Sequence, residues 1–253
     1  MHFSLPDVYP FYALSVLLAL LVGVLFPVAR HITDRKSRRQ YFTLQFVTFL
    51  SAIVGAKLAF LFGEFQWPFR SLDSWSQVIY SGRSIIGALI FGLLGAEIAK
   101  PIMGYSLLPN DRFASQLPFA FAIGRIGCLM TGCCRGIPYD GFWSVTYSDA
   151  IPRHPAPAYE IAFHVAAGIS AIWLVKTHRM VGHVFSLYLI AYGVFRFASE
   201  FLRETPKSMA SLSPYQWMSV GMILLGALFI AKRKIFPSKR WQAAIKGPIE
   251  QSC

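Results

Sequence analysis

Long apolar runs separated by short polar segments dominate this chain. Seven of the runs reach the length of about 20 residues that a helix needs to cross the hydrocarbon core of a bilayer. They occupy residues 9–29, 43–62, 78–99, 113–130, 158–175, 184–202 and 215–231. The pattern therefore predicts an all-α integral membrane protein with about seven transmembrane helices.

Two segments between the runs are not predicted to span. Residues 63–75 carry Trp67 and Trp75, and residues 131–157 combine four prolines with aromatic residues. Because Trp and Tyr concentrate at membrane–water interfaces, we expect 131–157 to form a loop or lid over a cavity mouth on the outer side. No Gly-, Ser- or Pro-rich linker divides the chain, so a single polytopic domain over residues 1–253 is expected.

The basic residues predict the orientation of these spans. If seven spans alternate, fifteen of the 24 Lys and Arg residues fall on the same side as the C-terminus. Lys and Arg close to span ends are retained in the cytoplasm, which places the N-terminus outside and the C-terminus in the cytoplasm. The fifteen are Arg30, Arg35, Lys36, Arg38, Arg39, Lys100, Arg112, Lys176, Arg179, Lys232, Arg233, Lys234, Lys239, Arg240 and Lys246.

Composition supports a membrane protein and disfavours a nucleic-acid binder. The chain is 55% hydrophobic and only 14% charged, with a mean hydropathy of +0.48. The net charge of +12 is concentrated in short segments beside the spans, which fits topology and anionic headgroups, so no nucleic-acid partner is expected. The first run follows Asp7 without a basic region and lacks a small-residue cleavage motif, so it is interpreted as an uncleaved span.

Charged residues inside the apolar runs are the candidates for function. Arg125 lies in FAIGRIGCL, and Arg196 and Glu200 lie in YLIAYGVFRFASEF. An unpaired guanidinium at mid-bilayer depth costs about 3 kcal/mol on insertion scales, so we expect these groups to share a polar cavity with an anionic partner. Gly124 and Gly127 flank Arg125, and such small residues allow either close helix packing or close approach of a lipid headgroup.

Three strings carry a resemblance to a known family. They are GRIGCLMTGCCRG at 124–136, PRHPAPAYE at 152–160 and YGVFRFASEFLRE at 192–204. In this order they resemble the phosphatidylglycerol:prolipoprotein diacylglyceryl transferases. Weaker matches are FYAL at 11–14, VGAKLAFLF at 54–62, GRSIIGALIFG at 82–92 and SPYQWMS at 213–219.

The resemblance implies a bacterial inner-membrane enzyme. Such enzymes move the diacylglyceryl group of phosphatidylglycerol onto the thiol of a lipoprotein-signal cysteine, so phosphatidylglycerol or a similar anionic phospholipid and a prolipoprotein signal peptide are the expected partners. It also implies catalytic roles for Arg125, Arg196, Tyr192 and Glu160. The substrate-binding set that we expect comprises both arginines and Gly124, Gly127, Tyr12, His154, Tyr159 and Arg83.

Some of these residues also have a purely structural explanation. Arg196 and Glu200 are spaced i,i+4, which on a helix also produces a structural ion pair. Tyr12 can equally be an interfacial anchor, and His154 can be a hydrogen-bonded histidine of the loop.

The chain departs from the family at the residue that the family uses to assist thiol deprotonation. The family carries a His-Gly-Gly motif in the third span, and Ile86 occupies the histidine position here. In the arginine motif, Cys128, Thr131 and Cys133 replace asparagines and a glutamate. An aliphatic side chain accepts no proton, so another group has to supply that step or the activity is lost.

The cysteine cluster of Cys128, Cys133 and Cys134 has four interpretations. It forms a disulfide, supplies a thiolate activated by a nearby arginine, packs inertly, or binds zinc. Its C-x4-C-C spacing differs from the usual C-x2-C zinc pattern, so no metal and no cofactor are expected. Cys133 joins the predicted catalytic set. Rival functions are a thiol-dependent lipid or acyl transfer using the cluster and a non-catalytic phospholipid-binding relative.

Overall fold

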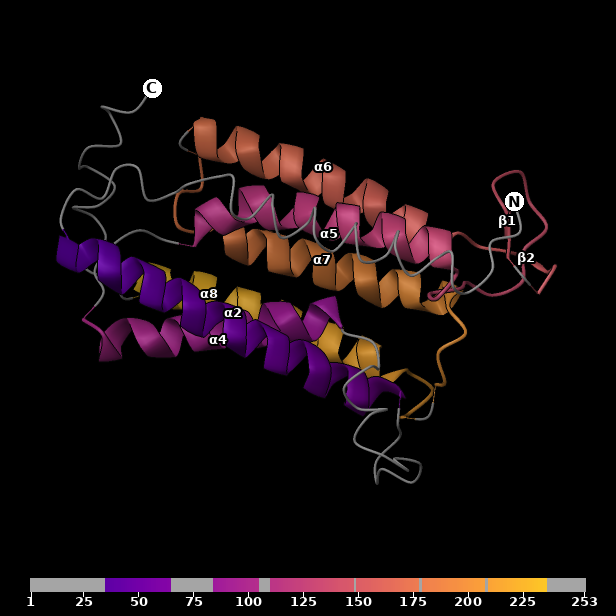
Figure 1. The fold of residues 1–253 in the computed structure, drawn as a ribbon, viewed down its shortest axis with the longest axis horizontal. Coiled ribbons are helices and arrows are strands. Elements are labelled where there is room, and N and C mark those ends of the chain that lie inside the picture. Colours follow the sequence, from indigo (N-terminus) through magenta and orange to yellow (C-terminus); the bar gives the residue numbers. More distant parts are fainter. Residues whose placement is uncertain are drawn as a thin grey trace. The chain divides into compact units, whose positions relative to one another are not determined.

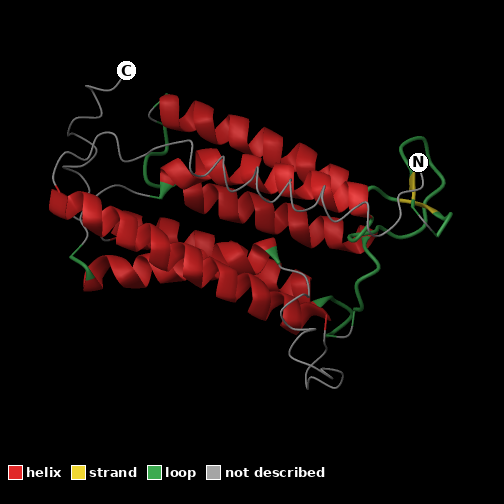
Figure 2. Ribbon diagram, in the orientation of Figure 1, coloured by secondary structure: helices red, strands yellow, loops and turns green. Residues whose placement is uncertain are grey.

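The computed structural model describes residues 35–64, 84–104, 110–147, 149–177, 179–207 and 209–235. Within these ranges the chain is almost entirely helical, with one small hairpin (Figures 1 and 2). The elements are α2 (Arg35–Glu64), α4 (Ile85–Ile102), α5 (Asp111–Thr131), β1 (Val145–Thr146), β2 (Pro152–Arg153), α6 (Ala156–Lys176), α7 (Val184–Ser199), the short 3-10 helix η2 (Glu200–Leu202) and α8 (Pro214–Ile235).

Five of the predicted spans and residues 84–99 of the span predicted at 78–99 lie in the described residues, and helices occupy all six. Each is long and apolar enough to cross a membrane. The helical fold class is thereby confirmed, and the protein is a multi-pass membrane protein. The predicted span at 9–29 and the segment 65–75 fall outside the described residues, so the count of seven and the orientation stay predictions.

Two compact units are distinguished by their internal contacts. One contains Asn110–Tyr188 and Val194–Pro206, which include α5, α6, the hairpin and both ends of α7. The other contains α2, α4 and α8 together with Leu189–Gly193, the middle turn of α7. The predicted single-domain organisation stays a prediction.

In the first unit, α5 packs along α6, and turns at the helix ends fix where each helix stops. Gly132 follows α5 with a φ of 64°, a left-handed conformation that glycine adopts without a steric penalty. At the opposite end of α5, the Asp111 carboxylate accepts hydrogen bonds from the amides of Gly182 and Phe185 at the start of α7. These contacts orient α5 and α7 for the side chains described below.

The segment 131–157 is ordered in its described residues and contains the hairpin. β1 and β2 pair antiparallel, with Val145 opposite Arg153. The stretch around Ile137 bonds on two sides, because its amide donates to the Leu202 carbonyl at 2.9 Å and its carbonyl accepts from the His154 amide at 3.1 Å. The loop is therefore fastened to the end of α7 through backbone hydrogen bonds, a connection that the sequence did not predict.

In the second unit, small residues allow α2 and α4 to approach closely. A Cβ added at Gly87 would overlap the carbonyl oxygen of Gly55, and one added at Gly95 would overlap Ser51. Tyr215 of α8 packs against Gly63 near the end of α2. Gly87 and Gly95 on α4 thus serve close helix packing.

Candidate active site

Five charged side chains from α5, α6, α7 and η2 meet at one end of the first unit. Arg125 Nε and Arg203 Nη2 both contact the Glu160 carboxylate, the latter at 2.5 Å. Arg196 Nη1 lies 2.6 Å from Glu200 Oε2 and 3.7 Å from Glu160 Oε1. We call Arg125, Glu160, Arg196, Glu200 and Arg203 the charge cluster.

The charge cluster is buried and rich in arginine. Both glutamates are fully enclosed, and the three arginines are at most 9% exposed. Among these five residues three guanidinium groups face two carboxylates. Guanidinium groups of this kind offer paired N–H donors that suit an anionic ligand such as a phosphate.

Local helix geometry explains how the charge cluster forms. Arg196 and Glu200 are one turn apart at the end of α7, where the helix tightens into η2 and the chain then turns extended at Arg203. The prediction of an Arg196–Glu200 pair is confirmed, and it coexists with the wider cluster. Arg203 was not predicted as a site residue, although it belongs to the FLRE end of the YGVFRFASEFLRE string at 192–204.

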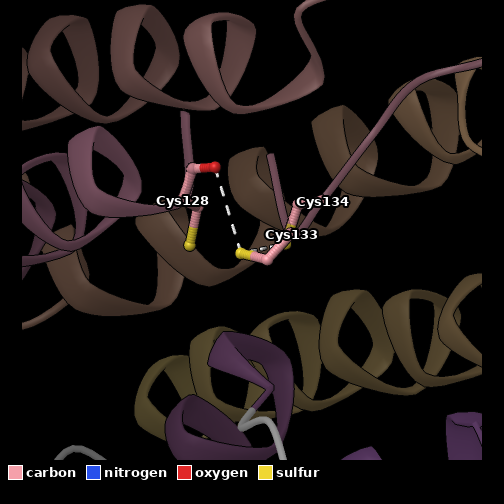
Figure 3. A group of neighbouring side chains, drawn as sticks. All are labelled: Cys128, Cys133 and Cys134. Carbon is pink, nitrogen blue, oxygen red and sulfur yellow. Dashed lines mark hydrogen bonds between the residues drawn. The ribbon is translucent and has the colours of Figure 1, made fainter. Parts of the chain in front are cut away.

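The three cysteines gather where α5 ends, beside the charge cluster. Figure 3 shows Cys128, Cys133 and Cys134 side by side, with the Cys133 thiol directed to the Cys128 carbonyl. The Cys133 and Cys134 sulfurs are 3.7 Å apart, and all three sulfurs lie within 4.8 Å of one another. The three are free thiols, so the disulfide interpretation is not what the structure shows.

Arg125 links the cysteines to the charge cluster. Its Nη1 lies 3.4 Å from the Cys134 sulfur and 3.8 Å from the Cys128 sulfur, while its Nε contacts Glu160. Hydrogen bonds from Cys128 and Cys133, together with the nearby guanidinium of Arg125, hold the pKa of the Cys134 thiol well below its usual range. Cys133, the predicted catalytic cysteine, is exposed, whereas the sulfur nearest to Arg125 Nη1 belongs to Cys134.

A second set of charged residues fastens the hairpin loop. Arg153 on β2 pairs with Asp149 at 2.9 Å and also contacts Glu204, which follows η2. Arg135 pairs with Asp149 at 2.9 Å. Arg153 additionally donates to the Gly136 carbonyl at 3.2 Å. These contacts hold the loop over the end of the helices that carry the charge cluster.

His154 and Tyr159 pack with the loop. The His154 ring stacks on Tyr139 with a centroid separation of 3.9 Å, and its Nδ1 lies 3.0 Å from the Tyr159 hydroxyl. Both residues were predicted to bind substrate. Their contacts match the alternative of a hydrogen-bonded loop histidine, and a substrate contact stays a prediction.

The other predicted site residues are placed as follows. Tyr192 is buried on α7, one turn before Arg196. Gly127 is buried, whereas a Cβ added at Gly124 would meet no described atom within 4 Å. Ile86 is buried on α4 in the second unit. Tyr12 and Arg83 lie outside the described residues.

His164 is a buried residue that sequence reasoning did not single out. It lies one turn after Glu160 on α6, and its Nδ1 is 3.1 Å from the Tyr188 hydroxyl on α7. The signal that was available was a histidine within an apolar helix, at i+4 from a candidate glutamate.

Comparison with known proteins gives consistent matches over most of the chain. Residues 2–232 match the sequence profile of the family described as prolipoprotein diacylglyceryl transferase. A phosphatidylglycerol–prolipoprotein diacylglyceryl transferase of Clostridium perfringens is 26% identical over 87% of this chain and 88% of its own length. Enzymes of the same name from Bordetella bronchiseptica and Aliivibrio fischeri are 31% and 30% identical, over 75% and 80% of this chain and 77% of their own lengths.

Proposed function

Because the chain belongs to the prolipoprotein diacylglyceryl transferase family, we propose that it transfers the diacylglyceryl group of phosphatidylglycerol to a cysteine thiol of a prolipoprotein. The observation that carries the proposal is the buried charge cluster, in which three guanidinium groups lie together with two carboxylates. A phosphodiester headgroup is an anion that guanidinium groups bind through paired N–H donors. We place the protein in the bacterial inner membrane, where both substrates are embedded.

The reaction needs cations where negative charge develops. The acceptor sulfur attacks the methylene carbon that joins the diacylglyceryl group to phosphate, an S–C bond forms, and the C–O bond breaks. The electron pair of that bond leaves on glycerol phosphate, and the thiol proton passes to a base. Arginine remains charged in a dry site and offers paired N–H donors to phosphate oxygens, so Arg125 and Arg196 stabilise the leaving group.

The neighbouring residues position these cations. Glu160 contacts Arg125 and Arg203 directly and orients both guanidinium groups. Tyr192 shares a helical face with Arg196 and offers a phenol hydrogen to the headgroup. Gly124 and Gly127 allow lipid atoms to approach α5. Tyr12, Arg83, His154 and Tyr159 complete the proposed binding set.

The acceptor of the thiol proton is the unusual part of this chain. Ile86 occupies the position at which the family has a histidine, and it cannot take a proton. The cysteine cluster lies beside Arg125 instead. We assign the function of the missing histidine to the cluster, with Cys133 as its exposed, catalytic member.

A transfer assay tests the proposed function. Purified protein is incubated with phosphatidylglycerol and a fluorescent signal peptide that contains one cysteine, and the diacylglyceryl thioether is measured by mass spectrometry. A peptide with serine in place of cysteine is the control. Lipid that stays bound while neither thioether nor glycerol phosphate forms would identify a non-catalytic lipid binder.

Conservative arginine variants locate the phosphate site. Arg125→Lys and Arg196→Lys keep the charge but lose the paired donors, so each should lower turnover by about tenfold or more, or about 1.4 kcal/mol. Glu200→Gln should have a smaller effect. Arg179→Lys is the matched control and should retain full turnover. Arg179 is exposed in the loop after α6 and lies over the ring of Trp173. Equal turnover in all the variants would reduce Arg125 and Arg196 to structural ion pairs.

A further inference from the structure

We propose that Cys128, Cys133 and Cys134 form a three-thiolate zinc site whose fourth position takes the sulfur of the acceptor cysteine. The inference rests on the proposed function and identifies a zinc ion as the group that activates the acceptor thiol. It departs from the expectation of no metal, which was drawn from linear spacing alone.

The fold brings together sulfurs that the sequence spacing sets apart. Gly132, with its φ of 64°, ends α5 and reverses the chain, so Cys133 and Cys134 return toward Cys128 in the last turn of the helix. Zinc–sulfur bonds of about 2.3 Å in a tetrahedral arrangement place sulfurs about 3.8 Å apart. The Cys133–Cys134 separation of 3.7 Å already matches, and the remaining separations, within 4.8 Å, close by small side-chain rotations.

Charge favours a divalent over a monovalent ion at this site. Three thiolates with one Zn²⁺ carry a net charge of minus one, whereas three thiolates with a monovalent ion such as Cu⁺ carry minus two. Either site would lie next to two buried glutamates, and the smaller net charge is the less costly one in a low-dielectric interior.

Arg125 joins the zinc site to the phosphate site. Its Nη1 lies 3.4 Å from the Cys134 sulfur and 3.8 Å from the Cys128 sulfur, the geometry of N–H···S hydrogen bonds that orient metal ligands. The same guanidinium contacts Glu160 in the charge cluster. A sulfur on the metal and a phosphate on the arginines would therefore meet beside one side chain.

A metal with three protein ligands and an open fourth position has the composition of a catalytic zinc site. The exposed thiol of Cys133 marks the side from which an acceptor peptide can approach. Zinc deprotonates a thiol that coordinates it, so the proton leaves to solvent on binding and no histidine is required. The bound sulfur then forms the S–C bond, the C–O bond breaks, and glycerol phosphate departs with the electron pair, without any change of oxidation state.

Cobalt substitution of the full-length protein in detergent tests the site directly. Co²⁺ should bind with one equivalent per chain and produce a sulfur-to-cobalt charge-transfer band. The band should shift when the cysteine peptide is added and stay unchanged with the serine peptide. Cys128→Ser, Cys133→Ser and Cys134→Ser should each remove or weaken the band, while Cys253→Ser, at the chain end, should leave it intact.

Two further measurements keep the outcome decisive if a serine variant folds poorly. In the unaltered protein, Zn²⁺ should protect Cys133 from maleimide. Chelation should lower transfer by about tenfold or more, and added Zn²⁺ should restore it. No cobalt band, or full transfer after the metal has been removed, would overturn the inference and leave the proposed function standing. A band that shifts with the cysteine peptide while no thioether forms would support the site and overturn the proposed function.

Discussion

At the scale of single residues, Glu160 holds the charge cluster together. It is fully enclosed and contacts Arg125 and Arg203. Glu160→Gln keeps the shape of the side chain but removes its charge, which leaves three buried guanidinium groups facing one carboxylate. Breaking a buried ion pair from one side costs about 3–5 kcal/mol, so we expect a large drop in the thermal unfolding midpoint of the purified protein.

Glu204→Gln is the matched control for that prediction. Glu204 also pairs with an arginine, Arg153, but its side chain is 48% exposed. Ion pairs at the surface contribute about 0–1 kcal/mol, so this variant should unfold close to the temperature of the unaltered protein. Equal midpoints for both variants would show that the enclosed pair contributes no more than an exposed one.

Asp149 gives the hairpin loop a defined pH dependence. Partial burial opposes ionisation, but the Ile151 amide and the guanidinium groups of Arg153 and Arg135 hold the pKa of Asp149 below its usual value of about 3.8. The group therefore stabilises the folded loop at pH values above 3.8, and this contribution is lost as the pH falls through the lowered pKa. The protection of the Val145–Arg153 amides from hydrogen exchange, relative to their intrinsic exchange rate at each pH, should therefore fall over that acidic range.

Substitution checks the assignment to Asp149. Asp149→Asn should show the faster exchange of Val145–Arg153 already at neutral pH, because both ion pairs are lost. Asp140→Asn, an exposed carboxyl in the same loop, should exchange like the unaltered protein. Protection that is the same at acidic and neutral pH in the unaltered protein, after correction for the intrinsic exchange rate, would contradict a role for Asp149.

Sequence reasoning found the residues of the site unevenly. Arg125, Arg196 and Glu200 could be identified from the sequence because a charged residue inside an apolar run is conspicuous. Arg203 and Arg153 were not selected, since both lie at span ends or in the loop, where basic residues are ordinary. Their partners, Glu160 and Asp149, are 43 and 4 residues away along the chain, and only the fold shows which carboxylate each one meets.

At the scale of elements, the packing of α2 on α4 depends on glycine. A Cβ at Gly87 would overlap the Gly55 carbonyl oxygen and the Ala59 side chain. Gly87→Ala should therefore force the helices apart and lower the unfolding midpoint, although alanine is the better helix former by about 1 kcal/mol. Gly221→Ala on α8, where a Cβ meets no described atom within 4 Å, should leave the midpoint unchanged or raise it.

The outcome separates packing from helix propensity. If propensity dominated, both variants would be more stable than the unaltered protein. If the close approach of the α2 and α4 backbones determines stability, the unfolding midpoint should fall for Gly87→Ala and stay unchanged or rise for Gly221→Ala. Far-ultraviolet circular dichroism at low temperature would verify that both variants keep their helices.

Helices were predictable from the sequence, and the order within the loop was not. Continuous apolar runs predicted the positions of the helices. The observed ends of α5, α6 and α8 agree with the predicted spans to within a few residues. The loop 131–157 was expected to lie at the interface because of its prolines and aromatics. Its hairpin consists of two-residue strands, and its attachment to Leu202 uses backbone groups, which leave no pattern in the side chains.

At the scale of the whole molecule, the two ends of the first unit differ in chemistry. The charge cluster, the cysteines and the hairpin loop lie at the end formed by the C-terminus of α5, the N-terminus of α6 and η2. Lys176, the last residue of α6, and Arg179, which follows α6, lie at the opposite end. Because basic residues at span ends are retained in the cytoplasm, the end with the charge cluster should face outward.

Topology mapping tests this orientation together with the count of seven spans. A green fluorescent protein fused after the C-terminus should fluoresce, since it folds in the cytoplasm, and an alkaline phosphatase fused there should be inactive. A membrane-impermeant maleimide applied to intact, chelator-treated spheroplasts should label Cys133, which is exposed, but should leave Cys253 unlabelled until the cells are lysed. Cys133→Ser should remove the early label and Cys253→Ser the late one. The reverse order of labelling would place the charge cluster on the cytoplasmic side, where an acceptor peptide exported across the membrane could not reach it.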